Sequence, residues 1–133
     1  MIVDDEETNL RLLSSWLSPL GYDFELASNG EEAVKKASDY RPDLIILDIM
    51  MRVMDGYEAC SLIKADPVTN NISIIMVTAL GDRESKLKGI SISSNDFLSK
   101  PIDQAELTVR VKNLLKIKVL EDFMLSHNER LKE

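Results

Sequence analysis

Four consecutive aliphatic residues, Leu44-Ile45-Ile46-Leu47, are followed directly by a carboxylate, Asp48. A run that is apolar at every position, instead of at alternate positions, is typical of a strand whose two faces are both buried. A strand is buried on both faces when it lies inside a parallel sheet that has helices on either side. The run therefore predicts a central strand of an α/β sheet that ends in an acidic side chain.

Short apolar runs alternate with segments of helical period along the rest of the chain. Strands are predicted over 2–3, 24–27, 44–47, 72–77 and 97–98, and helices over about 10–20, 31–40, 57–65, 83–90 and 103–133. Strands that alternate with helices imply right-handed parallel crossovers. The predicted fold is thus one doubly wound parallel sheet with helices on both faces.

Polar residues follow four of the five predicted strands, at the point where each strand ends. They are Asp4, Asp5, Asp48, Thr78 and Lys100. In an open α/β sheet the functional crevice lies at the carboxyl ends of the strands, beside the point where the strand order reverses. We therefore expect these side chains to meet at one edge of the sheet.

The chemistry of this predicted cluster is that of phosphoryl transfer. Three carboxylates placed close together repel one another, so either one of them holds a proton or a cation lies among them. Hard oxygen ligands with room for water favour Mg²⁺. A lysine and a hydroxyl beside such a metal would stabilise a phosphoryl group in transfer, and a carboxylate can itself be the nucleophile that forms an aspartyl phosphate.

Composition excludes several classes of protein. Acidic residues outnumber basic ones 23 to 16, which gives a net charge of -7 and makes direct binding to nucleic acid or to an anionic membrane a poor expectation. No apolar run is long enough to cross a bilayer. The single cysteine, Cys60, excludes an internal disulfide and fits a reducing compartment, so we expect a cytoplasmic protein.

Five segments, in order and at matching spacing, resemble the receiver domain of two-component response regulators. They are residues 2–6, 42–48, 54–58, 77–79 and 96–101. The resemblance extends from residue 1 to about 118. It implies a flavodoxin-like, five-stranded doubly wound sheet in the strand order 2-1-3-4-5, with an extended C-terminal helix, and a signalling phosphoacceptor instead of an enzyme.

The resemblance also implies the residues of a magnesium site. Asp48 matches the phosphoacceptor of the family. Asp5 matches a direct Mg²⁺ ligand, Asp4 matches one that acts mostly through water, and the backbone carbonyl of Met50 is implied as a further ligand. Phosphorylation of Asp48 by a histidine kinase, a phosphotransfer protein or a small acyl phosphate would then depend on Mg²⁺.

A second group of matched residues would respond to the phosphate. Lys100 is expected to pair with the phosphoryl group, and Thr78 to move toward it. Phe97 matches the switch aromatic that follows the threonine, and Pro101 matches a cis-proline that holds the loop after Lys100. The change would reach the surface made by the fourth helix, the fifth strand and the last helix, and through it an output domain or partner.

Arg52 is a departure from the family, which most often has proline at this position after the phosphoacceptor. Two interpretations remain open from the sequence. The arginine either loosens the loop that follows Asp48, or it places a cation near the phosphate.

The last predicted helix carries two apolar stripes. The first contains Leu107, Val111 and Leu114, and the second contains Ile117, Leu120, Met124, His127 and Leu131. The stripes are rotated from each other by roughly a third of a turn, so the helix needs two partners. We expect the first to cover the sheet of residues 1–118, and residues 119–133 to form a dimerising or connector helix toward an output domain, instead of a fraying tail.

The main interpretation is a module that a kinase phosphorylates. It would form a homodimer through the surface of the fourth helix, the fifth strand and the last helix, or through the last helix alone. Two alternatives differ from it. One is a receiver-like dimerisation module that accepts no phosphate. The other is an aspartate-nucleophile phosphatase of the haloacid dehalogenase type. That class normally needs a second acid two positions after its nucleophile, where this chain has Met50.

Overall fold

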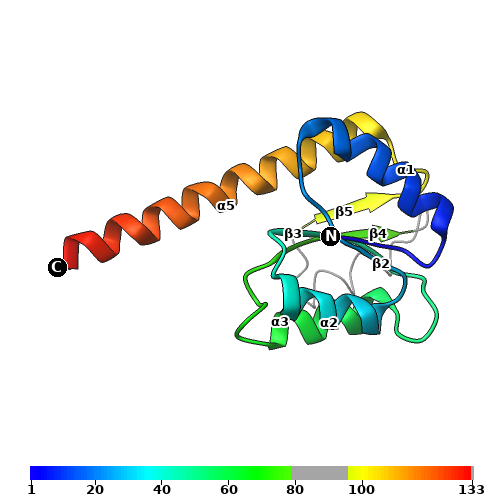
Figure 1. The fold of residues 1–133 in the computed structure, drawn as a ribbon, viewed down its shortest axis with the longest axis horizontal. Coiled ribbons are helices and arrows are strands. Elements are labelled where there is room, and N and C mark those ends of the chain that lie inside the picture. Colours follow the sequence, from blue (N-terminus) through cyan, green and yellow to red (C-terminus); the bar gives the residue numbers. More distant parts are fainter. Residues whose placement is uncertain (79–95, 133) are drawn as a thin grey trace.

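A computed structural model describes residues 1–78 and 96–132 and shows a parallel sheet between two layers of helices (Figure 1). The expected helix over 83–90 lies outside the described residues. The elements in chain order are β1 (Ile2–Val3), α1 (Glu7–Leu17), a 3-10 turn (Ser18–Leu20), β2 (Leu26–Ala27), α2 (Gly30–Tyr40), β3 (Leu44–Asp48), α3 (Gly56–Ala65), β4 (Ser73–Thr78), β5 (Asp96–Ser99) and α5 (Gln104–Lys132).

The strands of the described chain form one parallel sheet in the order β2-β1-β3-β4-β5, as predicted. In the register of this sheet Asp48 is aligned with Val77, and Thr78 with Ser99. The order reverses between β1 and β3, so the crevice expected at a topological switch point lies at the carboxyl ends of these two strands.

The apolar run of β3 supplies two hydrophobic cores at once. Ile45 and Leu47 lie in the core beneath α2 and α3, whereas Leu44 and Ile46 lie in the core beneath α1 and α5. Figure 1 shows these two pairs of helices on opposite faces of the sheet. The continuous pattern of the sequence therefore has the predicted cause, because successive side chains of one strand point to opposite faces and both faces are covered.

Two helices begin at side chains that cap their first turns. The side chain of Asn29 accepts a hydrogen bond from the backbone N–H of Glu32 at 2.8 Å at the start of α2. The side chain of Asp55 accepts one from the backbone N–H of Glu58 at 2.9 Å at the start of α3. Each cap satisfies a backbone donor that has no partner within the helix.

β2 is shorter than the strand predicted over 24–27. It spans only Leu26–Ala27, because its sole neighbour β1 is two residues long and offers pairing positions only at Ile2 and Val3. The side chain of Phe24 packs against the core beneath α1 and α5 instead of extending the strand.

α5 extends well past the sheet (Figure 1). Its 29 residues make a helix about 43 Å long at 1.5 Å per residue. Leu107 and Val111 in its first half are buried against the sheet, whereas Ile117 and Leu120 further along are half exposed. None of the helices that the structure describes is long and apolar enough to span a membrane.

Candidate functional site

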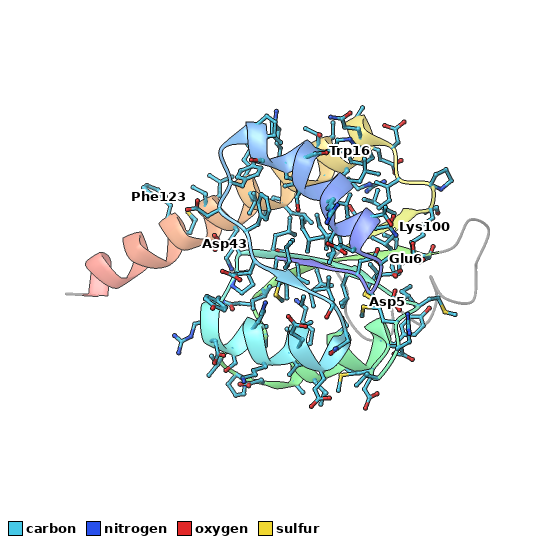
Figure 2. All side chains as sticks on the ribbon, turned by 45° about the vertical axis from the view of Figure 1, so that its right-hand side comes forward. Asp5, Glu6, Trp16, Asp43, Lys100 and Phe123 are labelled. Carbon is cyan, nitrogen blue, oxygen red and sulfur yellow. The ribbon has the colours of Figure 1, made fainter. Side chains whose placement is uncertain are left out.

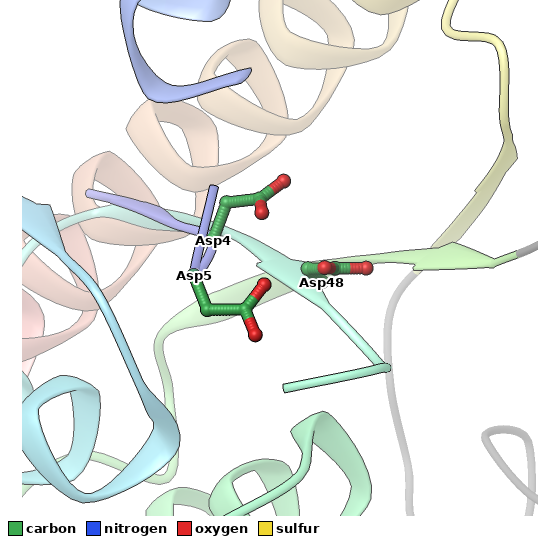
Figure 3. A group of neighbouring side chains, drawn as sticks. All are labelled: Asp4, Asp5 and Asp48. Atoms are coloured by element: carbon green, nitrogen blue, oxygen red, sulfur yellow. The ribbon is translucent and has the colours of Figure 1, made fainter. Parts of the chain in front are cut away.

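Three carboxylates converge at the carboxyl ends of β1 and β3. One oxygen from each of Asp4, Asp5 and Asp48 lies within 4.8 Å of the others. Figure 3 shows the three side chains extending from neighbouring strand ends into one region. Asp4 and Asp48 are buried, and Asp5 is partly exposed, so the cluster opens toward solvent on the side of Asp5.

Asp4 has a structural contact in addition to its place in the cluster. Its Oδ1 accepts a hydrogen bond from the backbone N–H of Glu6 at 2.9 Å, immediately before α1 begins. Acidic residues are also favoured near a helix N-terminus by the helix dipole. The acidic segment after β1 therefore both starts α1 and supplies two members of the cluster.

The backbone that follows Asp48 is held by a close approach that only glycine permits. A Cβ at Gly56 would lie 2.4 Å from the carbonyl oxygen of Asp48 and 2.8 Å from the Cα of Ile49. The backbone N–H of Gly56 donates to the carbonyl of Ile49 at 2.9 Å. The start of α3 is thus packed directly onto the end of β3. In the sequence Gly56 stood out only as part of the matched segment 54–58, and its contact with Asp48 was missed.

Lys100 reaches the cluster from the end of β5. Its Nζ lies 3.1 Å from Oδ1 of Asp48, and its backbone N–H donates to the carbonyl of Thr78 at 2.7 Å. The next peptide bond, between Lys100 and Pro101, is cis. Figure 2 shows Lys100, Glu6 and Asp5 close together on one side, with Asp43, just before β3, on the other side of the sheet.

The electrostatic environment of Asp48 disfavours its charged form. Burial raises the pKa of Asp48 to about 6, and repulsion from Asp4 and Asp5 adds to the effect, while the hydrogen bond and charge of Lys100 oppose it. Burial disfavours the charged form of Lys100, but the hydrogen bond and the charge of Asp48 outweigh this and raise the pKa of Lys100. A positive charge brought among the carboxylates would relieve their repulsion.

Thr78 and Phe97 occupy the neighbouring strands β4 and β5. Thr78 is the last residue of β4 and is buried, one position beyond the residue aligned with Asp48. Phe97 is partly buried and packs against the core beneath α2 and α3. The two residues therefore lie on adjacent strands, with Thr78 at the strand end next to that of Asp48 and Phe97 further inside the sheet.

Arg52 places a cation at the rim of the cluster. Its Nε lies 3.9 Å from Oδ2 of Asp5, and its side chain is 89% exposed. Of the two interpretations left open by the sequence, the observed contact favours the cation near the site. In the same loop the β-branched residue Val53 has a φ of 70°, a left-handed conformation that is unusual for such a side chain.

The donors present fit a magnesium ion. Carboxylate oxygens are hard ligands, and Mg²⁺ is usually bound through one or two carboxylates, with water and phosphate oxygens completing its shell. The three side chains of the cluster meet this requirement within 4.8 Å. The ligand expected from Met50 is its backbone carbonyl. Its side chain is exposed.

The strand order and the position of the site define a flavodoxin-like α/β domain with a cluster of carboxylates that could hold a metal at its topological switch point. Residues 1–112 match the family model of the response regulator receiver domain. The chain belongs to this family, and it is therefore a receiver module of two-component signalling. Receiver domains are signalling modules, not classical enzymes.

Similar sequences include longer regulators. Response regulator PleD of Caulobacter vibrioides is 39% identical over 122 residues, which cover 92% of this chain and 27% of PleD. The alkaline phosphatase synthesis transcriptional regulatory protein PhoP of Bacillus subtilis is 39% identical over 116 residues, which cover 87% of this chain and 48% of PhoP. The chain thus spans about a quarter to a half of the length of these relatives.

Similar solved structures include receiver domains of histidine kinases. The receiver domain of a signal transduction histidine kinase from Syntrophus aciditrophicus has 38% identity and a TM-score of 0.81, over 86% of this chain and 87% of that one. The receiver domain of sensor histidine kinase PA1611 from Pseudomonas aeruginosa has 30% identity and a TM-score of 0.80, over 86% and 94%. The latter structure has a magnesium ion coordinated in its active site cleft.

Proposed function

We propose that Asp48 accepts a phosphoryl group from the phosphohistidine of a sensor histidine kinase or phosphotransfer protein, or from a small acyl phosphate. The observation that carries the proposal is the position of Asp48 itself. It is a buried carboxylate at a strand end with the Lys100 ammonium 3.1 Å away and two further carboxylates beside it. A strand-end carboxylate in such surroundings is costly for the fold, which supports a chemical role.

The chemistry follows from the charges around Asp48. An oxygen of Asp48 attacks the phosphorus while the bond from phosphorus to the donor nitrogen or oxygen breaks, and the electron pair of that bond leaves with the donor. Asp4, Asp5, Asp48 and the carbonyl of Met50 would hold Mg²⁺. When bound, the ion would neutralise charge on the transferring phosphoryl oxygens. Lys100 would pair with the same oxygens after transfer.

The response to phosphorylation would travel from β4 to β5. The added charge draws the hydroxyl of Thr78 toward the new phosphate, and Phe97 on the neighbouring strand then repacks. Pro101, just after Lys100, holds the loop between β5 and α5 in place. The surface formed by the fourth helix, β5 and α5 would change as a result and would control an output domain or a partner. The module would act in the cytoplasm, without direct contact with nucleic acid or membrane.

The partner on the output side is proposed to be a second copy of this chain. Two surfaces suit such a homodimer: the face formed by the fourth helix, β5 and the start of α5, or the exposed far part of α5. Val109 at the start of α5 and Ile117 further along it are both exposed apolar residues.

Incubation of the chain with acetyl phosphate and Mg²⁺, followed by intact-mass measurement, tests the proposal. We expect one added phosphoryl group. It should not form when EDTA is present during the incubation, and it should be absent from Asp48→Asn. The matched control Asp39→Asn changes an exposed aspartate on α2 and should accept the group like the wild type. An unchanged mass in the wild type would favour the unphosphorylated dimerisation module, and turnover of a phosphate ester would favour the phosphatase.

A further inference from the structure

Arg52 lies at the rim of the carboxylate cluster with most of its hydrogen-bonding capacity unused. Its side chain is 89% exposed, and its Nε lies 3.9 Å from Oδ2 of Asp5. This long contact is the one ion pair that Arg52 makes within the described part of the chain, where the N–H donors of its terminal nitrogens have no protein partner. The guanidinium is therefore held near the site but is not used up by it.

The backbone around Arg52 is fixed. The backbone N–H of Met54 donates to the carbonyl of Arg52 at 2.8 Å, which closes a three-residue turn around Val53. The carbonyl of Met54 in turn accepts a hydrogen bond from the backbone N–H of Gly30 at 3.2 Å, at the start of α2. The loop that carries Arg52 is thus tied to α2, and its long side chain swings from a fixed point.

One carboxylate separates Arg52 from the residue proposed to accept the phosphoryl group. An oxygen of Asp5 lies within 4.8 Å of an oxygen of Asp48. Asp5 is the partly exposed member of the cluster, so Arg52 lies on the side that is open to an incoming molecule. Lys100 contacts Asp48 from β5, whereas Arg52 approaches through Asp5 after β1. The two cations therefore act on different members of the cluster.

The charge at this end of the sheet repels an anion. Four carboxylates lie close together here. They are those of Asp4, Asp5, Glu6 and Asp48. The two charges of a bound Mg²⁺ and the charge of Lys100 would leave one negative charge uncompensated. An acyl phosphate is itself doubly negative at neutral pH, and the whole chain has a net charge of -7. Among the described residues, Arg52 supplies the further cation that makes the mouth of the site neutral.

We propose that Arg52 binds the phosphoryl group of the incoming donor and favours donors in which that group is doubly charged, as in an acyl phosphate. Once Mg²⁺ takes up the carboxylate of Asp5, the guanidinium loses its long contact and its donors are available at the open side of the site. Arginine suits this role because its planar fork of N–H groups pairs with two phosphate oxygens at once.

The role of Arg52 rests on the proposed function, because it adds a donor-binding residue to the same site. The bonds that form and break at phosphorus stay those described above, since Arg52 acts before the transfer. A guanidinium that only restrained Asp5 would behave differently. Its loss would change the metal site, but it would not change how the reaction depends on the charge of the donor.

Phosphorylation by acetyl phosphate at saturating Mg²⁺, followed by intact mass, tests this role. We expect Arg52→Ala to lower the second-order rate constant about three- to tenfold at low ionic strength. Arg52→Lys keeps the charge and should recover most of the loss. The matched control is Arg11→Ala, because Arg11 on α1 is 77% exposed and also pairs with an exposed carboxylate, that of Glu7. It should react like the wild type.

Two comparisons separate donor binding from general damage to the site. Added salt should slow the wild type more than Arg52→Ala, because salt screens the attraction of the guanidinium for the donor. Phosphoramidate carries less negative charge than acetyl phosphate, so Arg52→Ala should lose less of its rate with this donor. A damaged site would lose the same factor with both.

Binding without reaction gives a further measurement. The Asp48→Asn protein should accept no phosphoryl group, so acetyl phosphate can bind to its Mg²⁺-loaded site without transfer. A titration followed by ³¹P NMR measures the dissociation constant of this complex. Adding Arg52→Ala to Asp48→Asn should raise that constant a few-fold, and adding Arg11→Ala should leave it unchanged.

The outcomes distinguish this inference from the proposed function. Phosphorylation of Arg52→Ala at the wild-type rate, or an equal loss with both donors, would overturn the role of Arg52 and leave Asp48 as the phosphoacceptor. A slower reaction with an unchanged dissociation constant would also overturn it, because Arg52 would then act in the transfer and not in donor binding. A wild type that accepts no phosphoryl group would overturn the proposed function, and the role of Arg52 with it.

Discussion

The ammonium of Lys100 lies 3.1 Å from Oδ1 of Asp48, so the two residues form an ion pair between the ends of β5 and β3. Because β4 lies between these strands, the pair spans the strand that carries Thr78. The backbone of Lys100 is also bonded to the carbonyl of Thr78. Charge at Asp48 is therefore connected directly to the two strands that carry Thr78 and Phe97.

Replacing Lys100 should make Asp48 harder to ionise. Lys100→Met removes the hydrogen bond and the positive charge that oppose burial, so the pKa of Asp48 should rise above about 6. Carboxyl ¹³C NMR titration of the metal-free protein measures this shift. Lys35→Met, an exposed change on α2, is the control and should leave the titration unchanged. A lower pKa in Lys100→Met would contradict the ion pair.

Asp48 should lower the stability of the metal-free fold at neutral pH. Its pKa is raised from 3.8 to about 6, so the folded chain holds a proton on Asp48 over a range in which the unfolded chain has lost it. Stability from this group is therefore greatest below about pH 4, falls as the pH rises to 6, and stays low above that. Asp48→Asn removes the penalty and should gain on the order of 2 kcal/mol at pH 7.5 and almost nothing at pH 4.

Urea unfolding of both proteins in EDTA at the two pH values measures this difference. Burial also lowers the pKa of the Met1 ammonium to about 6, but that group is the same in both proteins and cancels in the comparison. A gain in Asp48→Asn that is as large at pH 4 as at pH 7.5 would rule out titration of Asp48 as its cause.

Arg52 should weaken binding of Mg²⁺ by competing for Asp5. The guanidinium lies 3.9 Å from the carboxylate and is highly exposed, so the competition is modest and sensitive to salt. Arg52→Ala should tighten Mg²⁺ binding roughly two- to fivefold at low ionic strength, and less at high salt. Calorimetric titration of the unphosphorylated protein measures the affinity. Arg52→Lys retains the charge and should stay near the wild type; weaker binding in the alanine variant would instead mean that Arg52 supports the site.

Gly56 should tolerate no side chain. In Gly56→Ala the new Cβ meets backbone atoms of Asp48 and Ile49 that cannot rotate away, so β3 and α3 must separate. We expect a loss of at least about 2 kcal/mol in the free energy of unfolding, together with slower acceptance of phosphate. Gly21→Ala is the comparison, because Gly21 has a φ of 84° but open space around it and should cost only about 1 kcal/mol. Equal losses would show that the backbone contacts at Gly56 cost no more than the left-handed conformation at Gly21.

Much of the fold could be predicted because its signals are local. The run of β3 showed burial on both faces, and segments of helical period indicated α2 and α3. The strand predicted over 24–27 was too long, because its extent depends on how much of β1 is available to pair, and that is a property of a neighbouring strand. The contact of Gly56 with Asp48 was missed for the same reason, since a glycine after a helix cap looks alike whether or not a strand end lies against it.

The sequence by itself determined the succession of strands and helices along the chain, and which residue types follow each strand. It did so because side-chain periodicity and the polar residues that end each apolar run are local features of the sequence. Only the tertiary structure decided that Arg52 contacts Asp5, that Gly56 packs against the backbone of Asp48, and that β2 pairs over two residues. Such distances depend on how separate elements pack against one another. Atoms that are tens of residues apart become neighbours only when the sheet and its helices are assembled.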